Sequence, residues 1–304
     1  MYIHICDTMK KFYLLLPILA GIMFGSSGIF VRTLTQNGID QMTLPFLRFS
    51  IAIIPISIAM LLTDKKLFKI DFKYIPLFLV CSLTIIGLNL CYNESMNTIP
   101  LSLAAVLLSL APIYVLIFAY ILFGEKITKN KIICMLLALL GCILMTGILE
   151  SNITNVPLSG ILAGIGAGLF WAIYLMASKK AIENGIHTYT ILFYSIIFIS
   201  LLLIPFSDFG QINNFISINP IFAVIFLFVH STFSFGLPYI LSTLSLNYMD
   251  SGVSSILLSG TEPFAALLFG FIFYTEVPTL PMFIGFILTI IAIMMLSRNE
   301  DVSK

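Results

Sequence analysis

The residues best placed to do chemistry are polar side chains that interrupt long apolar stretches. Glu262 lies about halfway along the stretch 251–273, directly before Pro263, and Arg48 lies about one turn into the stretch 43–62. An ionised side chain at the centre of a bilayer costs about 2.5–3.5 kcal/mol on insertion scales, so it usually faces protein or water. We interpret Glu262 as a candidate site for a proton or a cationic group. Arg48 is more simply explained as snorkelling to the interface or capping a neighbouring helix.

Neutral polar groups mark two further stretches. Asn89 and Asn93 are one helical turn apart in the stretch 74–93, so they share a face and can hydrogen-bond a substrate together. In the stretch 220–245, Ser234 is a candidate, whereas the lone His230 is interpreted as a hydrogen-bonded structural residue. Pro238 lies in the same stretch and could break its helix and expose backbone carbonyls.

Aromatic residues suggest a wall of the same site. Trp171 is the only tryptophan, and Tyr174 and Ser178 lie on its helical face in the stretch 158–178. The alternative for Trp171 is an ordinary lipid or packing contact. The residues that we expect to bind substrate are Asn89, Asn93, Trp171, Tyr174, Ser234 and Glu262.

Known catalytic and cofactor motifs are missing from the chain. It contains no HExxH, no Gly-x-Ser-x-Gly and no phosphate-binding loop with its lysine. Gly160, Gly164 and Gly168 recur every four residues inside an apolar stretch, as do Gly21 and Gly25, which favours close helix packing over a dinucleotide site. The five cysteines form no CxxC pair and are interpreted as small buried apolar residues. We therefore expect no enzyme activity, no cofactor and no bound metal.

Composition indicates a polytopic membrane protein. Hydrophobic residues make up 60% of the 304 residues and charged residues 10%, against about 45–50% and 25% in soluble proteins. The net charge of +1 offers no reason to expect nucleic acid as a partner. A membrane-spanning helix needs about 20 apolar residues. The ten stretches that qualify are 12–33, 43–62, 74–93, 99–122, 131–149, 158–178, 189–206, 220–245, 251–273 and 280–297.

The lysines and arginines predict the orientation of these ten spans. With both termini in the cytoplasm, 13 of the 15 basic residues fall on the cytoplasmic side, and the remaining two are Arg32 and Arg48. Positive charge is concentrated in short cytoplasmic loops of membrane proteins. We expect a multi-pass protein of the cell membrane with cytoplasmic N- and C-termini.

One tripeptide shows that the chain contains an internal repeat. Asn37-Gly38-Ile39 recurs 147 residues later as Asn184-Gly185-Ile186, and at an offset of 151 Pro112 matches Pro263 and Glu125 matches Glu276. Each copy holds five spans, an odd number, so the copies must be inverted relative to each other. The predicted fold is all-α, with ten transmembrane helices as two inverted five-helix repeats, residues 1–150 and 151–304. Inverted repeats are common in secondary transporters, whose substrate site lies near the midplane between the halves.

Three motifs resemble the EamA-type transporters of the drug/metabolite transporter superfamily. They are the starts of the repeats (Phe24-Gly25-Ser26-Ser27 and Trp171-Ala172-Ile173-Tyr174), the pair Arg48-Phe49, and a fourth span with an internal proline and an acidic end (Pro112 with Gly124-Glu125, Pro263 with Thr275-Glu276). The resemblance covers nearly the whole chain and implies transport of a small metabolite, often export. It also implies a cavity lined by spans 1, 3, 4, 6, 8 and 9.

The leading hypothesis is a secondary transporter of a small metabolite, such as an amino acid or a derivative, that works by alternating access. Multidrug or organic-cation efflux is the alternative within transport, because a buried carboxylate with aromatics suits a cation. An intramembrane lipid-modifying enzyme is the alternative from another class. The expected partners are a small-molecule substrate and the lipid bilayer, and coupling to protons and a homodimer stay open.

Overall fold

A computed structural model describes residues 2–150, 157–275 and 278–299, and every regular element within these ranges is a helix. The long α-helices and their companions are α1 (Tyr2–Gly25), α2 (Ser27–Gln36), α3 (Thr43–Thr63), α4 (Ile75–Thr98), α5 (Leu101–Leu108), α6 (Ala111–Phe123), α7 (Lys129–Met145), α8 (Leu158–Glu183), α9 (Thr188–Leu203), α10 (Phe209–Ile218), α11 (Pro220–Ser231), α12 (Leu237–Ser245), α13 (Ser251–Tyr274) and α14 (Leu280–Asn299). Short 3-10 helices η1 to η4 cover Lys65–Phe68, Phe72–Tyr74, Ile148–Glu150 and Ile204–Phe206, and the π-helix η5 covers Thr232–Gly236.

The apolar stretches expected from the sequence coincide with these helices. In the described ranges, nine helical segments are long and apolar enough to cross a membrane. The predicted stretch 131–149 corresponds to α7, which has 17 residues and ends at Met145. It ends earlier than predicted because Gly147, two residues further on, has a φ of 66° that a continuing right-handed helix cannot adopt. The protein is thus an all-helical, multi-pass membrane protein.

Three of the membrane-spanning segments are interrupted near their middle. The first is broken at Ser26 between α1 and α2, the fourth at Ser109 and Leu110 between α5 and α6, and the eighth contains η5 between α11 and α12. Pro238, which was expected to disturb the helix of this span, lies at the start of α12, directly after the π-helix. Interrupted helices expose backbone polar groups, so in membrane proteins they occur where protein or a cavity covers them.

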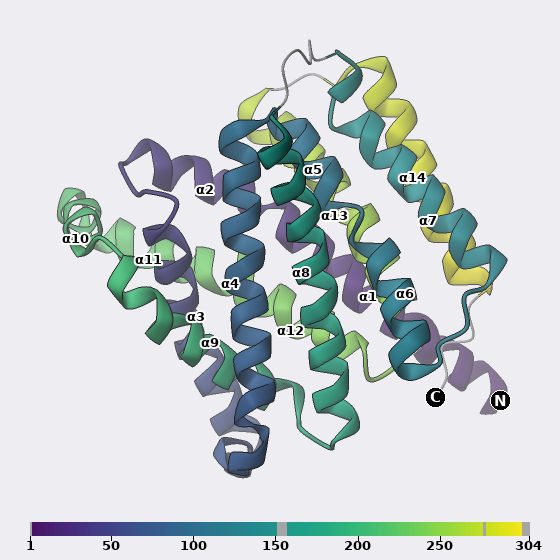
Figure 1. Ribbon diagram of the computed structural model, residues 1–304, viewed down its shortest axis with the longest axis horizontal. Coiled ribbons are helices and arrows are strands. Elements are labelled where there is room, and N and C mark those ends of the chain that lie inside the picture. Colours follow the sequence, from purple (N-terminus) through teal and green to yellow (C-terminus); the bar gives the residue numbers. More distant parts are fainter. Residues whose placement is uncertain (1, 151–156, 276–277, 300–304) are drawn as a thin grey trace.

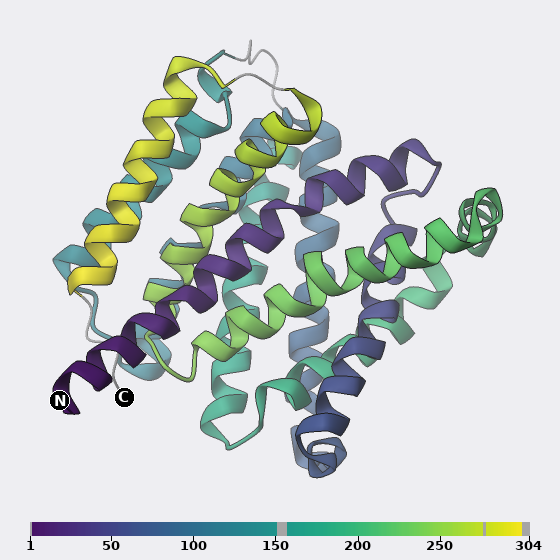
Figure 2. The ribbon, with the colours of Figure 1, turned by 180° about the vertical axis from the view of Figure 1, so that it is seen from behind.

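The most extensive helix contacts have counterparts in which the equivalent helices of the two repeats are interchanged. Helix α4 lies along α8 and α1 lies along α12, while α1 also packs on α13 and α8 on α5 and α6. Helices α3 and α9 pack on each other, and α7 lies beside α14 at one edge of the molecule (Figure 1, Figure 2). This arrangement is the one expected for two inverted five-helix repeats.

Glycines allow helices to cross at close range. A Cβ on Gly25 would lie 2.5 Å from the backbone oxygen of Glu262 on α13, and a Cβ on Gly168 would lie 3.2 Å from the backbone oxygen of Leu108 on α5. The glycine spacing therefore serves helix packing, as predicted. Because the α1–α13 crossing is so close, it places Glu262 directly beside the break at Ser26.

A buried charged network ties helix ends together at the end of the molecule where α1 begins and α14 finishes (Figure 2). Glu125, after α6, forms an ion pair with Lys179 of α8 and accepts hydrogen bonds from the Ser251 backbone N–H (3.0 Å) and hydroxyl (2.8 Å) at the start of α13. Lys131 of α7 pairs with Asp250 at 2.7 Å. In the second repeat the residue that matches Glu125 is Glu276, which lies outside the described residues.

Candidate functional site

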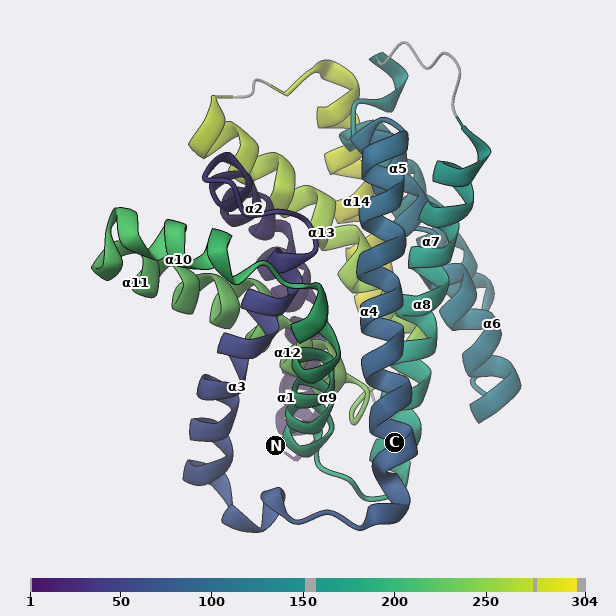
Figure 3. The same ribbon diagram turned by 60° about the vertical axis from the view of Figure 1, so that its left-hand side comes forward.

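An aromatic cluster lies at the centre of the helix bundle. Tyr239 of α12 contacts the rings of five other residues, with ring centroids 5.2–6.4 Å apart. The aromatic cluster consists of Phe24, Phe49, Trp171, Tyr174, Phe235 and Tyr239. It draws on α1, α3, α8, η5 and α12, helices that cross near the middle of the molecule (Figure 3). Both halves of the chain therefore contribute to one site.

Two of the sequence-predicted residues belong to this cluster. Trp171 is 6% exposed, with its ring 5.7 Å from that of Tyr239. Tyr174 is fully buried, and its hydroxyl hydrogen-bonds that of Thr243 at 2.8 Å. Trp171 is thus enclosed by protein, and the alternative that it contacts lipid is wrong. The side of α8 that carries Trp171 also carries Gly164 and Gly168, which pack closely on α5, so this side of the helix turns inward.

Arg48 lies against the same cluster, although the sequence interpretation gave it a structural role. Its side chain is 9% exposed, and its Nη2 donates a hydrogen bond to Asn89 Oδ1 of α4. The guanidinium lies over the ring of Phe235, with its central carbon 3.7 Å from the centroid. A buried guanidinium does not reach the interface, so the snorkelling interpretation is wrong. The position of Arg48, one turn inside an apolar stretch, was a sequence signal that could have identified it as a candidate site residue, as it did for Glu262.

The two asparagines have different surroundings. Asn89 is 7% exposed, accepts from Arg48, and donates to the Ile85 backbone oxygen at 2.7 Å. Asn93 lies one turn further along α4 and donates to the Gln41 backbone oxygen at 2.9 Å. The structure therefore brings Asn89 to the aromatic cluster and places Asn93 under the turn between α2 and α3.

Ser234 and His230 lie in and beside the π-helix. Ser234 is fully buried, and its hydroxyl is 3.5 Å from that of Ser26 at the break between α1 and α2. His230 is fully buried, and neither ring nitrogen has a hydrogen-bond partner among the described residues. The interpretation of His230 as a hydrogen-bonded structural residue is therefore wrong. Its ring stacks on Phe30 at 5.0 Å and meets Phe235 edge-on at 5.4 Å.

Glu262 approaches the cluster from α13. The residue is half-buried and lies within electrostatic range of Tyr239, Tyr92 and Cys142. Tyr239 is also within electrostatic range of Arg48, so a carboxyl group and a guanidinium both act on this ring. Five of the six predicted site residues therefore lie in the aromatic cluster or near it. They are Asn89, Trp171, Tyr174, Ser234 and Glu262, and Asn93 is the exception.

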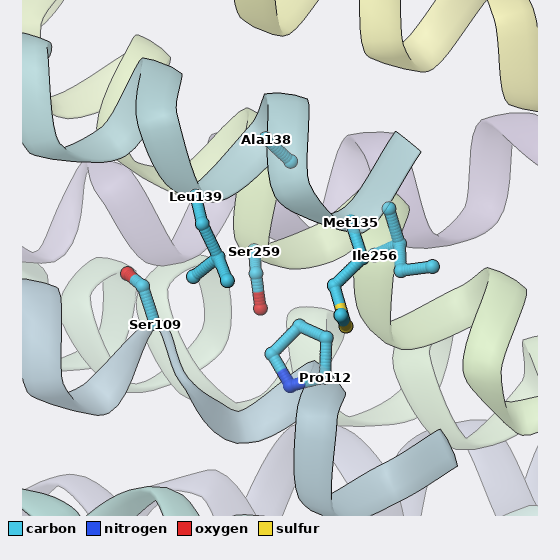
Figure 4. A pocket seen from close by; sticks show the side chains of 7 residues that line it. All are labelled: Ser109, Pro112, Met135, Ala138, Leu139, Ile256 and Ser259. Carbon is cyan, nitrogen blue, oxygen red and sulfur yellow. The ribbon is translucent and has the colours of Figure 1, made fainter. Parts of the chain in front are cut away.

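A small pocket nearby has the wrong chemistry for a polar ligand. It lies between α5, α6, α7 and α13, has no room for a water-sized molecule, and the Ser259 side chain points into it (Figure 4). Its other lining residues are Ser109, Pro112, Met135, Ala138, Leu139 and Ile256. Two hydroxyls in an apolar wall offer little to orient a charged solute, so this pocket is not the candidate site.

The described residues contain no cluster of three or more His, Cys, Asp or Glu side chains that could hold a metal ion. Cys81 and Cys142 are buried free thiols, and the Cys91 thiol is free and partly exposed. The side chain of Cys6 lies outside the described part of the chain.

Comparison with known proteins decides the family. The model of the EamA-like transporter family matches residues 11–147 and again residues 158–298. The chain belongs to this family. The double match also accords with its two-repeat architecture, and the family is one of transporters rather than enzymes.

Several relatives of this EamA-like protein are named as transporters. It is 27% identical over 273 residues to an uncharacterised transporter of Archaeoglobus fulgidus, covering 88% of this chain and 90% of the relative. It is 23% identical to the pseudopaline exporter CntI of Pseudomonas aeruginosa, covering 97% and 99%. It is 27% identical to the threonine/homoserine exporter RhtA of Escherichia coli, covering 64% and 61%.

A solved crystal structure shares the fold. It superposes with a TM-score of 0.78 over 94% of this chain and 97% of its own, at 16% sequence identity.

Proposed function

We propose that this EamA-like transporter exports a small metabolite, such as an amino acid or a derivative, across the cell membrane by alternating access. The observation that carries the proposal is the aromatic cluster, to which both repeats contribute and against which the Arg48 guanidinium packs. Named exporters among the relatives support the direction and the class of cargo. In repeat-built transporters the substrate site lies between the halves near the midplane.

Each predicted site residue has a role in this proposal. Trp171 and Tyr174 pack against the cargo, Asn89 and Ser234 hydrogen-bond it, and Glu262 binds a proton or a cationic group of the cargo. Asn93 acts at a distance, because its amide holds the turn after α2 at the mouth of the site. Proton coupling through Glu262 would make export depend on the pH difference across the membrane.

The charges favour one orientation. Lysines gather in the loops at the end of the molecule where α1 begins, and the two arginines outside that group are Arg32 and Arg48. Because positive loops stay in the cytoplasm, both termini are proposed to be cytoplasmic. The Glu125–Lys179 pair then closes the cytoplasmic side.

Flux measurements with purified protein in proteoliposomes test this function. We expect saturable flux of at least one solute from a panel of amino acids, dipeptides and lipophilic cations, measured with and without a proton gradient. Lack of saturable flux for every solute would refute transport of these classes. Flux of the lipophilic cations alone would favour multidrug efflux instead.

The role of Glu262 needs a separate comparison. Glu262→Gln should remove the pH dependence of flux, whereas Glu94→Gln should leave it unchanged because Glu94 is exposed at the end of α4. An unchanged pH profile in Glu262→Gln would exclude this residue from proton coupling while leaving the transport proposal intact.

A further inference from the structure

Arg48 is a buried cation with few partners. A guanidinium has five N–H donors. The hydrogen bond recorded for Arg48 runs from Nη2 to Asn89 Oδ1, and Nε is buried with no acceptor among the described residues. A buried donor that lacks an acceptor is destabilising, because it has lost its hydrogen bonds to water. The protein therefore keeps open hydrogen-bonding capacity at this place.

No anionic side chain compensates this charge within the described part of the chain. The groups that face it are neutral and come from each packed element. They are Asn89 on α4, Phe49 on α3, His230 on α11, Phe235 in η5 and Tyr239 on α12. The rings of Phe235 and Phe49, with centroids 3.7 and 5.4 Å from the guanidinium carbon, stabilise the charge by cation–π interaction. Aromatic faces leave the edge of the guanidinium plane, where the N–H donors point, free for an acceptor.

Unpaired polar atoms continue along the next helix. Both nitrogens of His230 lack hydrogen-bond partners among the described residues, as do the hydroxyls of Ser231 and Thr232 at the start of the π-helix, and all four atoms are buried. Single-turn π-helices inside α-helices frequently occur at functional sites. Four such polar atoms, together with Nε of Arg48, indicate a place that can receive polar atoms that the described part of the chain does not supply.

A narrow pocket adjoins Asn89, the partner of Arg48. It is lined by Phe49, Asn89 and Leu203, together with Met42, Pro45, Ile86 and Leu90, and its free volume of about 10 Å³ is close to that of one water molecule. It lies between α3, α4 and α9, so residues of both halves border it. In this conformation the pocket is too small for a solute.

We propose that Arg48, held in place by Asn89, binds a carboxylate group of the cargo, so that the transported class is small carboxylic acids, zwitterions included. A carboxylate matches the planar fork of a guanidinium with two parallel hydrogen bonds, which a neutral amide cannot do. Glu262 of α13 also lies within electrostatic range of Tyr239 and would face a cationic group of the same solute. This inference rests on the proposed transport function.

The single tryptophan provides a direct assay, because Trp171 lies in the aromatic cluster next to Tyr239. The probes are an equimolar mixture of the non-aromatic L-amino acids and the matched mixture of their amides, titrated against the intact protein in detergent. Charge-assisted hydrogen bonds contribute about 1.5–3 kcal/mol, so we expect the acids to change Trp171 emission at about 10- to 150-fold lower concentration than the amides. Equal responses to both mixtures, or no response to the acids, would overturn the inference.

Two variants test the residue itself. Arg48→Gln should abolish the preference for acids, and Lys180→Gln, which removes an exposed cation, should keep it. Asn89→Asp places a carboxylate beside Arg48, so it should leave the fold intact and still weaken acid binding about tenfold or more by competition. Unchanged acid binding in Arg48→Gln or in Asn89→Asp would refute the role of Arg48. If acid binding is unchanged in these variants but the unaltered protein still shows saturable flux in proteoliposomes, only the role of Arg48 is refuted. If the unaltered protein shows no saturable flux for any solute, the transport proposal itself is refuted.

Discussion

Removing the Glu125 carboxylate should destabilise the protein far more than removing a surface carboxylate. The side chains of Lys179 and Glu125 are 5% and 4% exposed, and the same carboxylate also accepts the backbone N–H and the hydroxyl of Ser251. Breaking a buried ion pair by removing one partner costs about 3–5 kcal/mol, because the other charge stays buried without compensation. We expect Glu125→Gln to lose about that amount of unfolding free energy.

An exposed pair in the same chain is the matched control. Lys73 and Asp71 are 3.1 Å apart, with side chains 65% and 69% exposed. Exposed pairs contribute about 0–1 kcal/mol, so Asp71→Asn should change the unfolding free energy by less than about 1 kcal/mol.

Equilibrium unfolding in detergent micelles, followed by Trp171 fluorescence, measures both variants. The double variant Glu125→Gln with Lys179→Met should lose less than the sum of its two single variants, with a coupling of about 0.5–3 kcal/mol. A Glu125→Gln variant no less stable than Asp71→Asn, or a double variant equal to the sum, would refute the reasoning that this network holds α6, α8 and α13 together.

Three further predictions follow from local contacts. Gly25→Val would push a side chain into the α13 backbone and should cost about 1–3 kcal/mol of unfolding free energy, whereas Gly28→Ala, with nothing within 4 Å of its Cβ, should be tolerated; equal stability of the two variants would contradict the close crossing. Partial burial raises the pKa of Asp40, but hydrogen bonds from the next turn lower the pKa by more. The ionised carboxylate should therefore stabilise the fold above about pH 4, and this contribution should be lost as pH falls through the lowered pKa. The unfolding free energy of Asp40→Asn should depend less on pH than that of the unaltered protein, and an identical pH dependence would exclude the effect. Tyr174→Phe removes the hydrogen bond to Thr243 and should cost about 1 kcal/mol in unfolding free energy, with an unchanged midpoint as the contrary result.

The membrane spans could be predicted from the chain because their cause is local. About 20 consecutive apolar residues are enough to require a helix in the bilayer, and the predicted stretches coincide with helices such as α3, Thr43–Thr63. The two matching turns were also readable, since Gly38 and Gly185 have φ angles of 84° and 79°, which favour glycine. The family followed from motifs spread over both halves.

The neighbours of each polar residue could not be predicted in this way. Asn89 and Asn93 share a helix face at one turn's spacing, yet the first meets Arg48 of α3 and the second the Gln41 backbone. The spacing along one helix defines which face a side chain occupies, but its partner depends on the level at which another helix crosses that face. Arg48 was judged by its own segment, and its lack of an anionic partner became visible only once α4, α11, η5 and α12 were packed around it.

The apolar pattern thus determines where the chain forms membrane-spanning segments, because each backbone polar group in lipid must be hydrogen-bonded within its own helix. Tertiary structure decides which charges meet. Glu125 and Ser251 are 126 positions apart and bond only because α6 ends where α13 begins. The same packing leaves Arg48 beside neutral partners. These partners lie on helices that are far apart in the sequence, so no local pattern could predict the surroundings of Arg48.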